Sequence, residues 1–155
     1  MAVSETANAS MAPLLAAART RAVTALDSKL QALVDAGITT GPEGTLVFAD
    51  RLRGAPLSCK AFGDRVGFEA WVNKLRIADC SEPLGIAPAI EQLAHALLLA
   101  RAVGDQARQA GLGVTVVLSV ERGVVFRFHG ARPEDRPWVT EVASHAGPLL
   151  VLTYR

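Results

Sequence analysis

The sequence has few cysteines, few aromatic residues and few charges, and each scarcity excludes a class of protein. Cys59 and Cys80 are its only cysteines, so the chain holds neither a zinc ribbon nor a CxxC redox motif. Two buried thiols in a reducing cytoplasm are the favoured interpretation, although a disulfide between the two cysteines stays open as an alternative. Aromatic residues make up 5% of the chain and charged residues 20%, whereas half of the residues are hydrophobic, which excludes general disorder.

No excess of charge of either sign is present. The sixteen basic and fifteen acidic residues give a formal net charge of +1, and they alternate along the chain instead of forming runs. This disfavours a dedicated nucleic-acid surface or a surface for anionic membranes. Lysine occurs only at Lys29, Lys60 and Lys74, and the preference for arginine, together with alanine-rich helices, favours a bacterial source with a GC-rich genome.

Long hydrophobic runs are also missing. The apolar stretch near the N-terminus follows no basic residue, is interrupted by Pro13 and ends at Arg19 and Arg21, so it fits a secretory signal poorly. The most apolar helical stretch, residues 93–103, contains His95 and Arg101 and is shorter than the roughly 20 residues that cross a bilayer. We therefore expect a soluble, cytoplasmic protein with no membrane insertion.

The known catalytic and nucleotide-binding motifs are absent as well. The GLG at residues 111–113 follows a helical pattern and precedes a strand, which is the reverse of a dinucleotide-binding loop. No GxGxxG, P-loop, GxSxG, HExxH or EF-hand spacing occurs, and the three histidines are far apart in the sequence. The sequence therefore predicts no cofactor and no metal, and whether the protein is an enzyme stays open.

What the sequence does contain is a well-specified β-hairpin over residues 113–130. If Glu121 and Arg122 form a turn and Gly123 adopts the left-handed conformation after it, Val120 faces Val124. Seven apolar side chains then share one face. A slip of one residue would turn all of them to water, so the register should be well specified. They are Val114, Val116, Leu118, Val120, Val124, Phe126 and Phe128.

The remaining patterns predict an α+β domain over residues 11–155, preceded by a disordered N-terminal tail over residues 1–10. We expect helices over residues 13–36, after Asp64, from Pro88 to Gly111 and, capped by Asp135, over residues 136–146. A hairpin of two short strands is expected over residues 45–49 and 57–62, and a last strand, residues 149–154, is expected to lie antiparallel beside residues 114–120. The expected architecture is a two-layer sandwich of order αββααββαβ, with a mostly antiparallel sheet of about five strands and helices on one face.

The far face of the hairpin gives the first functional hypothesis, a non-enzymatic accessory or protein-interaction domain. Two valines lie there among polar residues, and the last strand extends the strip. We expect this strip to bind another protein or a second copy of the chain, unless a helix of the same chain covers it. The candidate interaction residues are Val117, Val125, Arg127, His129 and Leu152.

Two further hypotheses belong to other classes. His129 and His145, joined by a segment that contains Asp135, could meet at one end of the sheet and form the site of a small-ligand binder or an enzyme. Weak nucleic-acid binding is the third hypothesis. It rests on the densest positive group, around the hairpin of residues 45–62, in which Arg51, Arg53 and Arg65 would contact phosphates.

Overall fold

The computed structural model describes residues 2–155 and contains a five-stranded antiparallel sheet, a small two-stranded sheet and five α-helices. The expected mixed α+β class with a mostly antiparallel sheet is confirmed. The helices are α1 (Ala12–Arg19), α2 (Ser28–Ala36), α3 (Arg65–Val72), α4 (Glu82–Ile86) and α5 (Ala89–Gln109). The strands are β1 (Val3–Ala7), β2 (Ile38–Thr40), β3 (Leu46–Phe48), β4 (Leu75–Arg76), β5 (Val114–Val120), β6 (Val124–Gly130) and β7 (Leu149–Tyr154).

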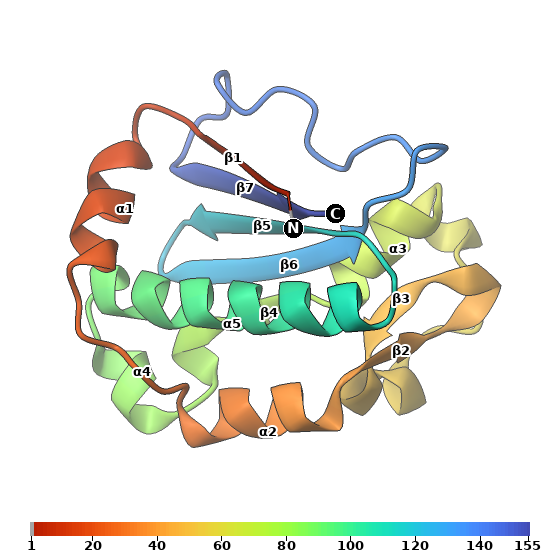
Figure 1. The fold of residues 1–155 in the computed structure, drawn as a ribbon, viewed down its shortest axis with the longest axis horizontal. Coiled ribbons are helices and arrows are strands. Elements are labelled where there is room, and N and C mark those ends of the chain that lie inside the picture. The colour runs from red at the N-terminus through yellow and green to blue at the C-terminus, as the bar shows by residue number, and fades with distance from the viewer. Residues whose placement is uncertain (1) are drawn as a thin grey trace.

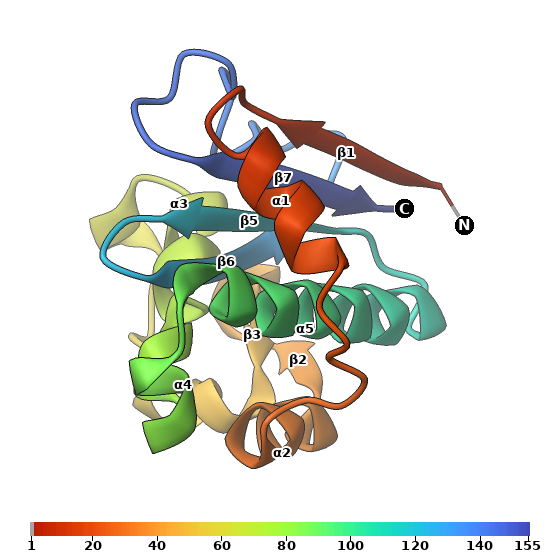
Figure 2. The ribbon, with the colours of Figure 1, turned by 90° about the vertical axis from the view of Figure 1, so that its left-hand side faces the viewer.

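The large sheet has the strand order β1-β7-β5-β6-β4 (Figure 1). Helix α5 runs along one face of this sheet, with α1 beside it and α2 beyond it (Figure 2). The predicted register of the central hairpin is confirmed, since Val120 pairs with Val124, Leu118 with Phe126 and Val116 with Phe128. The predicted place of the last strand is also confirmed, because β7 pairs antiparallel with β5.

The core lies between this sheet and α5. The seven apolar side chains of the hairpin all belong to it or pack against it. The two-stranded sheet is attached through Phe48, whose ring packs edge-on against Phe128 at 4.8 Å between centroids. Burial of a phenylalanine side chain contributes about 1.5–3 kcal/mol, so this contact fixes β3 against β6.

The expected disordered tail over residues 1–10 is wrong for most of its length. Residues 3–7 form β1, which pairs antiparallel with β7 from Val3 opposite Tyr154 to Ala7 opposite Leu150; residue 1 lies outside the described residues. The side chains of β1 are mostly exposed, which is consistent with their small and mostly polar residue types. It is ordered by backbone hydrogen bonds to the otherwise unpaired edge of β7, and these leave no hydrophobic pattern in the sequence.

The single helix expected over residues 13–36 is two helices. Helix α1 ends at Thr20, whose hydroxyl donates to the Ala17 carbonyl, and α2 begins after Asp27, whose carboxylate accepts from the Lys29 amide. The expected hairpin between residues 45–49 and 57–62 is also wrong. Strand β3 pairs instead with β2, and residues 57–62 form turns and a short 3-10 helix.

No helix forms over residues 136–146, which lie in a stretch of turns and bends between β6 and β7. The side chain expected to cap that helix, Asp135, accepts instead from Arg65 and Arg132. By contrast, the cap at Asp64 is present at the start of α3, where its carboxylate accepts from the Gly67 amide at 2.7 Å. An ion-pair network therefore replaces the expected capping interaction at Asp135.

Candidate functional site

Residues 131–148, here called the covering segment, cross the face of the sheet that α5 leaves free. In Figure 1 the segment runs from the end of β6 to the start of β7 on the side away from α5. Side chains at alternate positions of β5, β6 and β7 point toward it, among them Val117, which pairs with Val151. This far face of the sheet is therefore covered by the chain itself, but by an irregular segment and not by a helix.

A cavity of about 840 Å³ lies between the covering segment and the sheet. Its roof is made by covering-segment residues between Ala131 and Ser144. Its floor combines apolar and hydrogen-bonding side chains from four strands, namely Thr6, Thr115, Val117, His129, Val151 and Thr153. A concave, partly apolar space with a few convergent polar groups is the usual form of a small-molecule site.

His129 is the most unusual group on this floor. It is 3% exposed, and its Nδ1 lies 2.8 Å from the Gly130 carbonyl oxygen. Because a carbonyl only accepts, Nδ1 carries the proton in the neutral ring and Nε2 is left with a free lone pair. Among the described residues, Nε2 has no hydrogen-bond partner. A buried acceptor without a partner is costly, so its presence beside a cavity points to a ligand group that donates to it.

Burial lowers the pKa of His129 below its ordinary value, and the hydrogen bond to the Gly130 carbonyl offsets only part of this effect. The imidazole is therefore neutral at pH 7, and the free energy of unfolding should depend on its titration. As the pH falls below about 6.5, the unfolded chain binds a proton that the folded chain binds only at lower pH, so stability is lost.

We expect this loss to reach a slope of at most about 1.4 kcal/mol per pH unit as the pH falls from about 6.5 toward the lowered pKa of His129. Urea unfolding across this range should show a flatter pH dependence for His129→Gln, because glutamine does not titrate. His145→Gln is the matched control for the substitution itself, since His145 is exposed and lies outside the cavity. Equal slopes in wild type and His129→Gln would contradict the assignment of a neutral buried imidazole.

Hydroxyl groups continue from His129 across the sheet. Thr115 on β5 pairs with His129, Thr153 on β7 pairs with Thr115, and Ser4 on β1 pairs with Thr153. Directly paired side chains on one face lie about 4.5–5.5 Å apart at their Cβ atoms. The Thr115 and Thr153 hydroxyl oxygens are 3.0 Å apart and hydrogen-bond to each other. From His129 to Thr153, one end of the cavity floor is thus a row of hydrogen-bonding groups next to the valines, whereas Ser4 lies outside the cavity.

An ion-pair network holds the start of the covering segment. Arg132 donates to both carboxylate oxygens of Glu69, at 2.6 and 3.2 Å, and to Asp135 at 3.0 Å. Arg65 from α3 also donates to Asp135, at 2.8 Å, and to Glu134. Burial would raise the pKa of Asp135, but the two guanidinium groups outweigh this and lower it. The roof of the cavity is therefore fixed to α3 at this end.

The other end of the segment is fixed by Asn8, which is 4% exposed. Its amide nitrogen donates to the carbonyl oxygens of His145 and Gly147, and its side-chain oxygen accepts from the amides of Met11 and Leu149. Between the two ends, the guanidinium carbon of Arg127 lies 4.9 Å from the ring centroid of Trp138, a cation-π contact. The segment is thus anchored at both ends and in the middle.

The residues predicted for a ligand site are only partly brought together. His129 and Asp135 line the same cavity. His145 does not line it and lies exposed near the end of the covering segment, where its Nδ1 is 3.0 Å from the Gly147 carbonyl oxygen. The expected meeting of the two histidines is wrong, because His129 lies near the end of β6 and the segment has crossed the sheet to the start of β7 by His145.

The predicted interaction strip is not an exposed surface. Val117, Val125 and His129 are at most 3% exposed, because the covering segment lies over the far face. Leu152 pairs with Val116 and belongs to the core on the opposite face, so its assignment to the strip is wrong. Only Arg127 is half-exposed, and it is in contact with Trp138.

The arginines predicted to contact phosphates do not act together. Arg65 is occupied by Asp135 and Glu134, whereas Arg51 lies at a different surface cavity beside Lys74, to whose carbonyl it donates at 3.4 Å. Arg53 is exposed in a 3-10 helix and is not among the residues lining that cavity. The hairpin that was expected to group the three arginines does not exist.

Sequence reasoning missed four residues that build the site, namely Glu69, Arg132, Thr115 and Thr153. Alternation along the hairpin already placed Thr115 on the far face, and the pairing of β7 with β5 could have placed Thr153 beside it. Glu69 is spaced for the polar side of α3, yet it is completely buried. No local pattern signals that Arg132 reaches it.

Comparisons with known proteins give one result. The model of a protein family described as the Uncharacterized protein PM0498 family matches residues 6–146, a range that includes Asn8, Glu69, His129 and nearly all of the covering segment. No curated protein and no solved structure matches the chain. Over residues 2–155, no helix has the length and apolar character needed to cross a membrane.

Proposed function

The chain belongs to the Uncharacterized protein PM0498 family, and we propose that it works by binding a small molecule in the cavity beneath the covering segment. The observation that carries this proposal is the free Nε2 of His129, a buried acceptor on the cavity floor without a partner among the described residues. A bound hydroxyl or N–H group would donate to Nε2 and remove the cost of leaving it unpaired.

The surroundings of His129 define the kind of molecule that fits. The threonine pair Thr115 and Thr153 offers hydroxyls that both donate and accept, and Val117 and Val151 offer apolar contact next to them. A neutral imidazole accepts a hydrogen bond without adding charge, so this part of the floor suits an uncharged polar group. The proposed ligand is therefore a small, partly apolar molecule with at least one hydrogen-bond donor.

The two cysteines support a cytoplasmic place for this function. Cys59 and Cys80 are free and buried. Burial raises the pKa of the Cys80 thiol to about 11, which keeps it protonated and unreactive at neutral pH. Unpaired thiols are typical of proteins in a reducing compartment.

The experiment is a fragment screen by NMR with ¹⁵N-labelled protein, using phenols, alcohols and primary amides as the probes. We expect members of this set to shift the amide signals of Thr115, His129 and Thr153, and to shift Nε2 of His129 in spectra of the imidazole nitrogens. The variant His129→Gln should weaken binding by about threefold to tenfold, the equivalent of one hydrogen bond.

His145→Gln is the matched control, because it makes the same substitution in the covering segment outside the cavity. It should bind the same fragments as the wild type. Two outcomes would contradict the proposal: no fragment shifts the signals of the cavity floor, or the fragments that do so bind His129→Gln with unchanged affinity. Unfolding curves of both variants show whether the fold is retained.

A further inference from the structure

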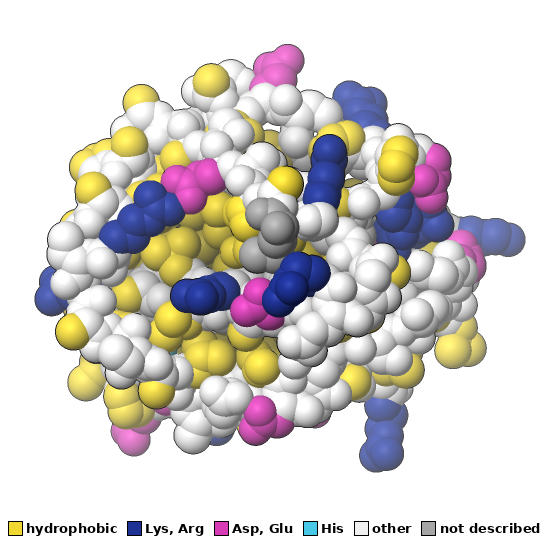
Figure 3. Space-filling view, in the orientation of Figure 1, with side chains coloured by type: hydrophobic (Ala, Val, Ile, Leu, Met, Phe, Trp, Pro, Cys, Tyr) yellow, Lys and Arg dark blue, Asp and Glu magenta, His cyan; other side chains and the backbone are white. Residues whose placement is uncertain are grey.

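A second hollow, on the opposite face of the sheet, has an apolar interior and a charged rim. It has a volume of about 640 Å³ and lies between α1, α5 and the strands β1 and β7. Figure 3 shows it as a recess of hydrophobic side chains near the centre of the view. The apolar lining comes from α1 and the loop after it, from α5 and from β7, and its main members are Ala18, Val23, Ala94, Leu97, Leu152 and Tyr154.

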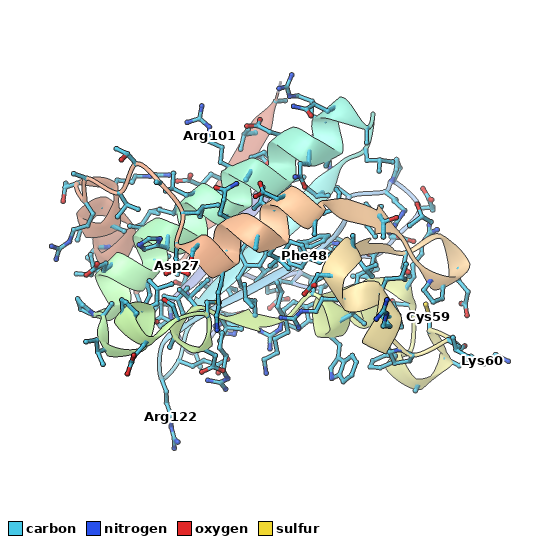
Figure 4. All side chains as sticks on the ribbon, turned by 90° about the horizontal axis from the view of Figure 1, so that it is seen from below. Asp27, Phe48, Cys59, Lys60, Arg101 and Arg122 are labelled. Carbon is cyan, nitrogen blue, oxygen red and sulfur yellow. The ribbon has the colours of Figure 1, made fainter. Side chains whose placement is uncertain are left out.

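The rim of this hollow is positively charged. Arg19, Arg21 and Arg101 line it, against a single carboxylate, that of Glu5. Arg19 forms an ion pair with Glu5. Arg21 and Arg101 have no ion-pair partner among residues 2–155, and Arg101 projects outward from α5 in Figure 4. Two arginines thus remain to attract an anionic group at the mouth of an apolar recess.

Tyr154 adds a hydrogen-bond donor to the same hollow. Its ring lies directly against α5, because Gly104 has no Cβ there; a Cβ would approach the ring to 2.4 Å. Burial raises the pKa of Tyr154 to about 12, and the charges of Asp105 and Glu5 act in the same direction. The phenol therefore stays protonated, and among the described residues its hydroxyl makes no hydrogen bond.

We propose that this hollow binds a single amphiphile, an aliphatic chain that ends in an anionic group. The chain would lie against the leucine and alanine side chains of α5, and the anionic group would lie at the rim between Arg21 and Arg101. The charge of the rim selects this occupant over a neutral or cationic chain. Its concave shape, between two helices and an edge strand, suits one molecule and not a flat membrane surface. This site is separate from the cavity beneath the covering segment and goes beyond the function proposed above.

The test uses decanoate as the probe, well below the concentration at which it forms micelles, with decyltrimethylammonium as the cationic counterpart. Tyr154 is the only tyrosine of the chain, so its ring signals in NMR spectra report on this hollow alone. We expect decanoate to bind with one molecule per chain in calorimetry and to shift these signals, and decyltrimethylammonium to bind at least tenfold more weakly.

Two variants locate the contacts. Arg101→Gln should weaken decanoate binding by about threefold to tenfold, whereas Arg108→Gln, a matched change on the same helix outside the hollow, should leave it unchanged. Val23→Trp, which fills the hollow from a half-exposed position, should abolish it. The proposal is overturned if decanoate does not shift the Tyr154 signals, if both head groups bind equally, or if binding occurs only to vesicles of anionic lipid.

Discussion

Replacing Glu69 with alanine is expected to lower the free energy of unfolding by about 3–5 kcal/mol, the cost of breaking a buried ion pair from one side. The Glu69 carboxylate is completely buried and accepts from the amides of Leu46 at 2.5 Å and Gly130 at 2.9 Å, as well as from Arg132. Without it, two buried N–H groups lose their acceptor at once, and the Arg132 guanidinium keeps only Asp135 and the Gly44 carbonyl.

The effect should reach beyond α3, because Glu69 connects elements that are far apart in the sequence. Leu46 belongs to β3, Gly130 ends β6, and Arg132 begins the covering segment. Urea unfolding measures the loss, and amide exchange of Leu46 and Gly130 should show where protection falls first. Glu69→Gln, which keeps acceptor oxygen but no charge, should lie between wild type and Glu69→Ala.

Glu134→Ala is the control for this prediction. Glu134 also pairs with an arginine of the network, but it is exposed, and its loss leaves Asp135 on Arg65. Its unfolding midpoint should stay close to that of the wild type, since exposed ion pairs contribute little. If Glu69→Ala lost no more stability than Glu134→Ala, Glu69 would not be the buried anchor that the structure shows.

The parts of the fold that could be predicted are those in which one periodicity leads to one burial pattern. The hairpin register follows from alternation over residues 114–128, because any slip would expose the whole apolar set. The start of α3 follows from Asp64, an N-cap with nothing competing for its carboxylate. In both places the local sequence and the final environment favour the same structure.

The site could not be predicted because its anchors are polar contacts between distant segments. Asp135 has the same sequence signature as Asp64, yet it binds Arg65, which is 70 residues away. The spacing of Val139, Val142 and Ala146 fits a helix, but the segment forms turns and bends across the sheet, with the network holding its start. The sequence did place His129 and Asp135 together, but the path that separates His145 from them depends on contacts that have no local signal.

Asn8→Ala is expected to have the second large effect, a loss of about 2–4 kcal/mol in the free energy of unfolding, because four hydrogen bonds to the backbone, two of them fully buried, depend on this one side chain. Asn8 follows β1 and links three elements. It accepts from Met11 at the start of α1 and from Leu149 at the start of β7, and it donates to two carbonyls of the covering segment. Amide exchange should show the largest loss of protection at Leu149 and near Gly147.

Asn8→Asp separates the two halves of this anchor. Aspartate keeps the oxygen that accepts from Met11 and Leu149, but places a carboxylate opposite the carbonyl oxygens of His145 and Gly147, to which Asn8 donates. Protection at Leu149 should then persist while the end of the covering segment opens, and fragments should dissociate faster from the cavity beneath it. Ser10→Ala removes an exposed hydroxyl bound to the same Asn8 oxygen and should change neither. Equal exchange in Asn8→Asp and wild type would mean that the Asn8 amide does not hold the segment, and that the roof depends on the Arg132 network and the contact of Arg127 with Trp138.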